Sequence, residues 1–381
     1  MAKDGTAASQ TVLEGQAAID LWLRGKAAWN TWAQAHQGWT VNLAGADLAA
    51  HLSGTAAQRI SFAGFQFPGP TVFEGARFGG LEVSFARVVF QNGYTDFTYC
   101  KFESKDVNFF EANFGNGSLR FDRSEFGMGY TNFIHAIFGP GADTSFGDVT
   151  FNGPVSFDGA QFQSLNGVSF HGASFSRNVH FTNVKAAAPI DFRGTRVAHP
   201  LSLDNCKVDL IRHRYRRIFW RARNDHDAAC FRRLKQLAID SKDHLLEQDF
   251  FRKEQLAARH WETRGIALIP GFLYEWLSDF GRSILRPTVF LAAIALLSIC
   301  FYYYMGDHKT RTVQAAALFA MGQLVGISSW SAEARTTGVT TLFGNLATVP
   351  FSVHVVAVMQ GVLSVISLFL IGLGLRNRFR I

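Results

Sequence analysis

The sequence predicts a chain of mixed β and α structure, in which a long repetitive β region precedes several helices. Three observations lead to this fold class. Phenylalanine recurs in pairs from about residue 62, the chain becomes charged and helical in pattern over 209–265, and two uncharged apolar stretches lie within 266–381. A fixed period is typical of a repeat architecture, so the first observation determines the structure of nearly half the chain.

The two phenylalanines of each pair lie five residues apart, and the pairs recur every 11 to 13 residues. Two residues before most of the paired phenylalanines stands a small or β-branched residue, such as Ile60 or Val83. A period of five fits neither a helix nor a single strand, but it fits a coil that turns a corner after each short extended face. The pairs predicted to fill its core are Phe62/Phe67, Phe73/Phe78, Phe85/Phe90, Phe97/Phe102, Phe109/Phe114, Phe121/Phe126, Phe133/Phe138, Phe146/Phe151, Phe157/Phe162 and Phe170/Phe175, and they fade into Phe181/Ala186, Phe192/Val197 and Leu203/Val208.

This pattern resembles the repeat of the pentapeptide-repeat family, whose consensus is close to Ala-(Asp/Asn)-(Leu/Phe)-x-x. The plain form occurs at residues 42–48, Asn-Leu-Ala-Gly-Ala-Asp-Leu. The resemblance covers residues 41–208 and implies a right-handed quadrilateral β-helix, a solenoid with the central Phe or Leu stacked inside. Two Phe pairs per coil would give about 24 residues per turn. Each buried Phe contributes on the order of 1.5–3 kcal/mol in transfer free energy, so we expect a rigid rod.

A rod of this kind needs its ends covered, and residues 1–40 are predicted to supply an N-terminal capping helix. Residues 21–32 read as an amphipathic helix on which Trp22, Trp29 and Trp32 are available to pack. A Trp-Asn-x-Trp helix just before the first repeat also resembles the N-terminal cap of this family. Plain core packing is the ordinary interpretation of these tryptophans.

Composition limits the remaining possibilities. A chain of 381 residues is expected to form two or more domains, and its net charge is +7. The four cysteines are scattered without a C-x-x-C motif, so neither disulfides, nor zinc, nor any other cofactor is indicated. Cys100 and Cys206 occupy the small inward position of the repeat, which predicts buried thiols. The polar start of the chain lacks a signal-peptide pattern, and we therefore expect a cytoplasmic β-helix.

Residues 209–265 are predicted to form a basic helix followed by a helical hairpin. Residues 210–223 interleave arginines with aromatic residues, which favours a membrane-facing or intersubunit helix. A solvated face and a nucleic-acid interface are the alternatives, and we expect no nucleic-acid partner. Residues 226–241 and 244–262 predict an antiparallel helical hairpin similar to one tetratricopeptide-like unit. One such unit has no partner repeat, so it should pack on the β-helix end or on another subunit.

Residues 266–381 are predicted to form a two-helix transmembrane domain. Residues 287–305 and 353–375 carry no charge and are long enough for a hydrocarbon core of about 30 Å. The tyrosines at 302–304 are expected at the interface, as in aromatic belts. A buried core helix is the alternative for both stretches.

Arginines flank both predicted spans and are the candidate contacts to anionic lipids. They are Arg282 and Arg286 before the first span, and Arg376, Arg378 and Arg380 after the second. The positive-inside rule then places both chain ends in the cytoplasm and residues 306–352 outside, as in a multi-pass protein of the inner membrane. Residues 281–287 and 370–380 also resemble segments of bacterial pentapeptide-repeat proteins with a C-terminal two-span region.

The loop between the spans contains a third apolar stretch, residues 312–327. Its 16 residues suit a re-entrant or interfacial helix better than a span, and a polar turn follows at 328–331. This order is the plan of a two-span pore module. Similarity to potassium-channel pores stops there, because no Thr-Val-Gly-Tyr-Gly filter is present. The candidate pore-lining residues are Gln323, Ser328, Ser329 and Gln360, and a hydrogen bond across a helix interface is an equally good interpretation of Gln360.

These features favour an oligomeric channel or pore whose cytosolic β-helix senses or gates. The alternative is a membrane-tethered scaffold in which the β-helix presents a surface to a protein partner. Membrane lipids, further copies of the chain and a cytosolic protein are the expected partners. A DNA-mimicking rod would be acidic, unlike this chain, and no catalytic motif or paired carboxylates indicate an enzyme.

Overall fold

The computed structural model describes residues 11–52, 59–80, 82–141, 143–215, 219–324, 329–345 and 348–379. The chain divides into two compact units, Met1–Glu262 and Thr263–Ile381. We call them the strand unit and the helical unit, and describe each by itself. The boundary lies close to the predicted start of the last domain at residue 266.

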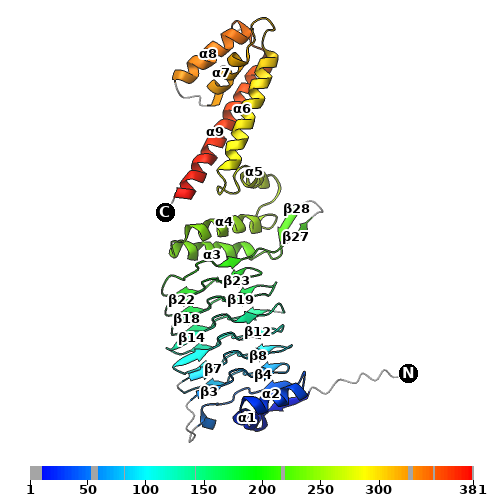
Figure 1. Ribbon diagram of the computed structural model, residues 1–381, viewed down its shortest axis with the longest axis vertical. Coiled ribbons are helices and arrows are strands. Elements are labelled where there is room, and N and C mark those ends of the chain that lie inside the picture. Colours follow the sequence, from blue (N-terminus) through cyan, green and yellow to red (C-terminus); the bar gives the residue numbers. More distant parts are fainter. Residues whose placement is uncertain are drawn as a thin grey trace, which may run out of the picture. The chain divides into compact units, whose positions relative to one another are not determined.

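A long run of short parallel strands makes up most of the strand unit (Figure 1). One stack contains β1 (Val12–Glu14), β2 (Thr40–Asn42), β5 (Thr71–Val72), β9 (Thr95–Asp96), β12 (Leu119–Arg120), β16 (Thr144–Ser145), β20 (Val168–Ser169) and β24 (Ile190–Asp191). A second contains β6 (Arg77–Phe78), β10 (Lys101–Phe102), β13 (Glu125–Phe126), β17 (Thr150–Phe151), β21 (Ser174–Phe175) and β25 (Arg196–Val197).

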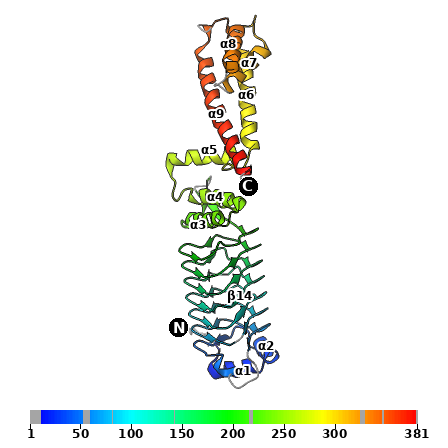
Figure 2. The same cartoon turned by 90° about the vertical axis from the view of Figure 1, so that its left-hand side faces the viewer.

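Two further stacks complete the set. One contains β3 (Arg59–Ser61), β7 (Glu82–Ser84), β11 (Asp106–Asn108), β14 (Tyr130–Asn132), β18 (Val155–Ser156) and β22 (Val179–His180). The other contains β15 (Ile137–Phe138), β19 (Gln161–Phe162), β23 (Lys185–Ala186) and β26 (Lys207–Val208), and bridges at Asn113 connect it to β4 (Gln66–Phe67) and β8 (Val89–Phe90). Figure 2 shows the strands stacked edge to edge.

The pairing register agrees with the expected spacing of the repeat. Lys101 pairs with Arg77 on one side and with Glu125 on the other, each 24 residues away. Between strands the chain turns sharply: the Phe65 amide donates to the Phe62 carbonyl oxygen at 3.1 Å, and Gly64 has φ of +70°. Glycine adopts this left-handed conformation without strain. A tight backbone turn thus forms the corner between two successive strands.

Stacked phenylalanine rings fill the centre of the strand unit. Phe97 lies between Phe73 and Phe121, with ring centres 4.8 and 4.7 Å away and planes within 8° and 2°. These distances match the separation of neighbouring strands. The described residues form four such columns: Phe62, Phe85, Phe109, Phe133, Phe157 and Phe181; Phe67, Phe90, Phe114, Phe138 and Phe162; Phe73, Phe97, Phe121, Phe146, Phe170 and Phe192; and Phe78, Phe102, Phe126, Phe151 and Phe175. Every Phe predicted for the core is buried.

Phe114 differs from the expected repeat in its backbone. The other phenylalanines of its column end short strands, whereas Phe114 follows a single bridge residue, Asn113, and belongs to no strand. The reason is local: the Gly115 amide donates to the Asn113 side-chain oxygen at 3.0 Å. At the equivalent position Gln163 donates along the ladder to the Phe138 carbonyl oxygen at 2.8 Å.

The Phe114 side chain nevertheless holds its predicted place in the core. It is 2% exposed, and its ring centre lies 5.5 Å from that of Phe90 and 5.0 Å from that of Phe138. The first of these distances is the longest in that column. An Asn side chain that binds the backbone two residues ahead competes with strand pairing. The spacing of the phenylalanines gives no information about this competition, so the missing strand could not be predicted from it.

From residue 11 onward the structure has two helices before the repeat, where one helix was expected over residues 21–32. They are α1 (Gly15–Leu23) and α2 (Lys26–Ala35). Gly25 separates them with φ of +88°, a conformation that interrupts a helix. The hydrophobic spacing continues across this break, and therefore the sequence pattern alone suggested a single helix.

The tryptophans of these helices cover the first coil. Trp22 stacks on Phe62 with ring centres 5.4 Å apart, and Trp29 meets Phe67 edge to face at 5.2 Å. Their Nε1 groups donate to the carbonyl oxygens of Ser61 and Gln66 at 3.0 and 2.9 Å. The end of the aromatic columns is thereby shielded from water. A short 3-10 turn, η1 (Ala50–Leu52), lies farther along the chain.

A helical hairpin, α3 (Asp227–Asp240) and α4 (His244–Ala258), packs on the last coil, one of the two places expected. Phe231 and Leu234 of α3 belong to the same buried cluster as the phenylalanine columns. Arg233 donates to the Thr195 carbonyl oxygen at 3.1 Å, and Lys253 to that of Val208 at 2.6 Å. The hairpin therefore satisfies backbone acceptors that the last strands leave open.

We expect Asp243→Ala to destabilise this hairpin by about 1 kcal/mol. The Asp243 carboxylate accepts hydrogen bonds from the amides of Leu245 and Leu246 at the start of α4. Alanine leaves both donors unpaired, whereas Asp243→Ser should retain most of the stability. Thermal unfolding followed by circular dichroism measures the difference, and equal melting of wild type and Asp243→Ala would contradict the capping role.

Residues 212–215 and 219–222 pair as two antiparallel strands, where a basic helix was expected. They are β27 (Arg212–Tyr215) and β28 (Phe219–Ala222), with Arg214 opposite Trp220. The helix prediction was wrong because it relied on the basic and aromatic composition. It overlooked that Arg212 and Arg214 alternate with His213 and Tyr215. A period of two places one set of side chains on each face of a strand.

The helical unit contains η2 (Gly265–Ala267), α5 (Leu268–Ser278), α6 (Leu285–Met305), α7 (Val313–Leu324), α8 (Ser329–Phe343) and α9 (Phe351–Phe379). Among the described residues, α6 and α9 are long and apolar enough to cross a membrane, and they include the two predicted spans. The apolar stretch predicted over 312–327 contains α7. Helix α5 was not predicted.

Of the polar turn expected at 328–331, the described residues 329–331 belong to helix α8. Its threonines have modest helix propensity, which conceals the helix in the sequence. Packing against α7 compensates for this modest helix propensity. The two helices approach closely, because a side-chain carbon on Gly338 would lie 2.7 Å from the Phe319 Cβ. Only a glycine allows the two helices this approach. Tyr302 also differs from the expected interfacial belt, because it is buried, while Tyr304 is exposed.

Candidate functional site

A buried glutamine joins three helices within the helical unit. Gln360 of α9 is 2% exposed. Its Oε1 accepts a hydrogen bond from the Tyr302 hydroxyl of α6, and its Nε2 donates to the Ala320 carbonyl oxygen of α7, both at 2.9 Å. A polar group removed from water is costly unless it is hydrogen-bonded. The Gln360 amide therefore holds α6, α7 and α9 in one arrangement. This agrees with the interpretation of Gln360 as a residue that forms hydrogen bonds across a helix interface, rather than with that of a pore-lining residue.

Small side chains line the contact between α6 and α9. Ser298 of α6 and Ser364 and Ser367 of α9 are buried. The Ser367 hydroxyl donates to the Leu363 carbonyl oxygen at 2.7 Å, whereas the Ser364 hydroxyl has no partner among the described residues. Small residues let apolar helices approach closely. The buried serines of α6 and α9 are consistent with such an approach.

The other predicted pore-lining residues are dispersed. Gln323 lies near the C-terminal end of α7 and is half-buried, and a side-chain carbon on Gly361 would stand 3.9 Å from its carbonyl oxygen. Ser329 is the first residue of α8. Ser328 lies outside the described residues. A lining formed by these residues stays a prediction.

The predicted lipid-contacting arginines gather at one end of the helical unit. Arg282 and Arg286 adjoin the start of α6, and Arg376 and Arg378 lie in the last turn of α9. The Asn377 amide donates to the Gly281 carbonyl oxygen at 3.2 Å, which ties the two segments together. Arg380 lies outside the described residues. Four arginines from distant parts of the sequence therefore share one region.

An apolar groove adjoins these arginines between α5 and α6. It has a volume of about 730 Å³ and is lined by Trp276, Leu277, Leu285, Arg286, Val289, Phe290 and Ala293. The rings of Trp276 and Phe290 meet at 5.5 Å, edge to face. Nη1 of Arg286 donates to the Glu275 carbonyl oxygen at 3.3 Å. The sequence did not indicate this groove, because α5 was not predicted.

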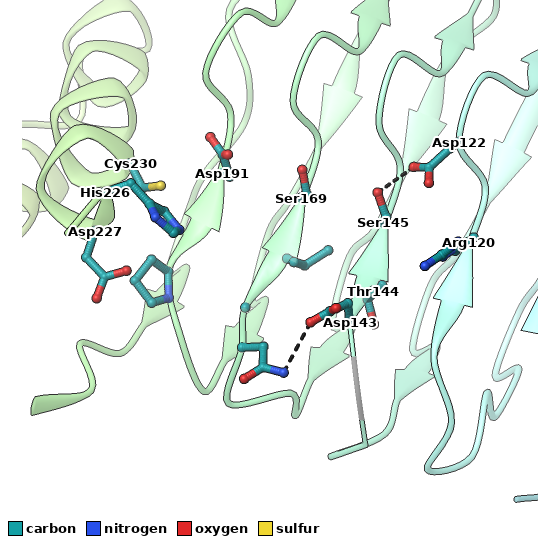
Figure 3. A pocket seen from close by; sticks show the side chains of 14 residues that line it. Arg120, Asp122, Asp143, Thr144, Ser145, Ser169, Asp191, His226, Asp227 and Cys230 are labelled. Atoms are coloured by element: carbon teal, nitrogen blue, oxygen red, sulfur yellow. Dashed lines mark hydrogen bonds between the residues drawn. The ribbon is translucent and has the colours of Figure 1, made fainter. Parts of the chain in front are cut away.

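A polar groove of about 290 Å³ lies on the strand unit, lined by β12, β16, β20, β24 and the start of α3 (Figure 3). Ser145, Ser169 and Asp191 hold paired positions on successive strands and form a row. His226 and Cys230 stand at one end of it. The stacking of the coils therefore aligns polar side chains as well as phenylalanines.

The acidic groups of the polar groove are already bonded. The Asp122 carboxylate accepts from the Ser145 hydroxyl, and that of Asp143 from the Asn166 amide at 3.1 Å. Burial opposes ionisation of Asp191, but hydrogen bonds from Arg193 outweigh it and lower the pKa of Asp191.

Burial shifts the titration of two further groups of the polar groove toward higher pH. Burial raises the pKa of Asp227, and it raises the pKa of the Cys230 thiol to about 12. A protonated thiol is a poor nucleophile. Within the described residues, no group of three or more His, Cys, Asp or Glu is placed to hold a metal ion.

The β27–β28 hairpin carries a cationic and aromatic cluster. The Arg221 guanidinium lies 4.0 Å from the Trp261 ring centre and 4.5 Å from that of Tyr215. Trp220 is half exposed, with the Arg214 guanidinium 5.8 Å from its ring. These are cation–π distances. The hairpin is thus anchored by Arg221 and presents Trp220 to its surroundings.

No model of a protein family matches the chain, and a search of curated proteins found no significant match.

Proposed function

We propose that the chain is a membrane-anchored scaffold whose strand unit offers an interaction surface to a cytosolic protein. In this proposal the strand unit is a right-handed quadrilateral β-helix of the pentapeptide-repeat type. Helices α6 and α9 cross the inner membrane, and both chain ends lie in the cytoplasm. The protein has no catalytic role of its own.

One observation carries the membrane anchor. Only 11% of the most apolar stretch of α6 and 22% of that of α9 is buried in the protein. The exposed side chains include Leu296, Leu297, Val362, Val365 and Phe369. Apolar surfaces of this extent are avoided in water but match a hydrocarbon core. The arginines at one end of both helices agree with headgroups at that level.

The polar groups of the helical unit favour an anchor over a water-filled pore. Gln360 uses its amide oxygen and nitrogen within the subunit. The large exposed side chains near the middle of α9 are apolar, whereas the selective parts of channels present backbone carbonyl oxygens or charged side chains to the permeating ion. Both spans are therefore better suited to lipid and helix contacts.

A channel formed by several copies is the second candidate. Helix α7 favours it, because Phe319 and Ala320 of this short apolar helix are buried against α6 and α9. Membrane proteins tolerate such short helices where protein encloses them. The described residues of one copy supply two candidate spans, so a pore would require a homo-oligomer.

Reconstitution of the purified full-length protein into liposomes separates the two candidates. For a scaffold we expect resistance to alkaline extraction and ion flux equal to that of protein-free liposomes. Mass measurement in detergent gives the number of copies. Flux from an oligomer that changes on Gln323→Ala would establish the channel instead. Release of the protein by alkaline carbonate would contradict membrane anchoring and with it both candidates.

A further inference from the structure

We infer that the apolar groove between α5 and α6 binds one anionic phospholipid, with an acyl chain in the groove and its phosphate at Arg286. The inference rests on the proposed membrane anchoring. It goes beyond a general attraction of arginines to lipid, because it assigns a single site with defined walls. Its volume of about 730 Å³ lies in the range of small-molecule sites.

The walls of the groove suit a hydrocarbon chain. Val289, Phe290 and Ala293 of α6 form one side, and Trp276 and Leu277 of α5 the other. From Arg286 to Ala293 the groove extends about 10 Å along α6, at 1.5 Å per residue. Leu285 and Val289 are more than half exposed. Burial of acyl-chain methylenes against these apolar walls favours binding.

The charge of the region favours a negatively charged headgroup. Among the described residues that line the groove, Arg286 is the charged one. Arg282, Arg376 and Arg378 lie in the same region and outnumber the carboxylates of Glu275 and Asp279. A guanidinium binds phosphate by charge-assisted hydrogen bonds. Trp276 is exposed at the edge of the groove, and tryptophan is enriched at headgroup level.

The site can be observed through Trp276. The full-length protein is reconstituted into phosphatidylcholine vesicles in which a minor fraction is brominated phosphatidylglycerol or, in parallel, brominated phosphatidylcholine. Bromine quenches nearby indoles, and subtraction of the Trp276→Phe signal isolates this residue from the other seven tryptophans. We expect Trp276 to favour the anionic lipid about fivefold, which corresponds to about 1 kcal/mol for one arginine at an anionic surface.

Three variants test the assignment. Arg286→Gln should abolish the preference for brominated phosphatidylglycerol, whereas Arg378→Gln removes the same charge outside the groove and should preserve it. Ala293→Phe should reduce quenching by both lipids, because the ring fills the groove. Equal quenching of the wild type by the two lipids, or equal effects of Arg286→Gln and Arg378→Gln, would overturn the lipid site.

A flotation experiment distinguishes failure of the lipid-site proposal from failure of the proposed membrane anchoring. Wild type and variants should all float with the vesicles after alkaline treatment. If they float and the preference is absent, the groove holds no specific lipid and the anchor stands. If the wild type does not float, both the anchor and the lipid site fall. Native mass spectrometry provides a second measurement, with bound phosphatidylglycerol expected for wild type and lost in Arg286→Gln.

Discussion

Replacing Phe121 with aspartate is expected to unfold the strand unit. Phe121 is fully buried and stacks between Phe97 and Phe146, with ring centres 4.7 and 5.0 Å away. Truncating a buried Phe costs about 3–5 kcal/mol. Keeping a buried carboxyl protonated at pH 7 adds about 4 kcal/mol, because its ordinary pKa is near 3.9. The sum approaches the whole stability of a typical domain, about 5–15 kcal/mol.

Matched variants separate loss of stacking from a general effect of substitution. Phe121→Leu keeps an apolar side chain and should lower stability far less. Met128→Asp introduces the same carboxylate at a position that is 70% exposed and should melt like wild type. Far-UV circular dichroism and limited proteolysis follow the strand unit. Unchanged melting of Phe121→Asp would contradict the aromatic columns.

The strand unit was largely predictable because its signal is local and repeated. Each pair such as Phe97 and Phe102 carries the same information, and one irregular coil, such as that at Phe114, does not alter the period. The four separate columns were less apparent, because they depend on how a coil closes. Rings of different columns meet edge to face, as do Phe97 and Phe109 at 6.0 Å and 87°. The spacing of phenylalanines in the sequence does not predict these contacts.

Elements that occur once were harder to predict. The break at Gly25 and the β27–β28 hairpin each depend on a few residues whose tertiary contacts override composition. Arg221 is an example: in the sequence it belongs to a basic run, but in the fold it stacks on Trp261, 40 residues farther along the chain. Helix α8 is also a product of packing, because Gly338 permits close approach to Phe319. Such tertiary contacts are difficult to predict from a single sequence.

In the candidate site, Gln360 could be identified from the sequence, but its hydrogen-bond partners could not. Gln360 was conspicuous as a polar side chain within an apolar helix. Its hydrogen bonds to Tyr302 and Ala320 join segments 58 and 40 residues away, and no periodic pattern predicts them. The apolar groove at Arg286 was missed for the same reason: it requires α5 beside α6.

Gln360→Leu is expected to loosen the helical unit without affecting the strand unit. The variant removes both hydrogen bonds and leaves the buried Tyr302 hydroxyl and Ala320 carbonyl oxygen without their partner. Interhelical hydrogen bonds in membrane proteins contribute about 0.6 kcal/mol each, up to about 1.7. An unpaired buried group costs about 1–3 kcal/mol. We therefore expect a loss of about 1–3 kcal/mol in total.

A double-mutant cycle with Tyr302→Phe tests the direct contact. Replacing both partners by apolar groups is less costly than removing one, so the double variant should be more stable than the sum of the single losses predicts. Helical circular dichroism during titration from a mild detergent into sodium dodecyl sulfate gives the stabilities, with Gln323→Leu as a control that leaves both bonds intact. Strict additivity would show that the two side chains do not interact. Flux measurements on the same variants extend the test to function: in a scaffold all remain silent, whereas in a channel the altered packing of α7 changes conduction.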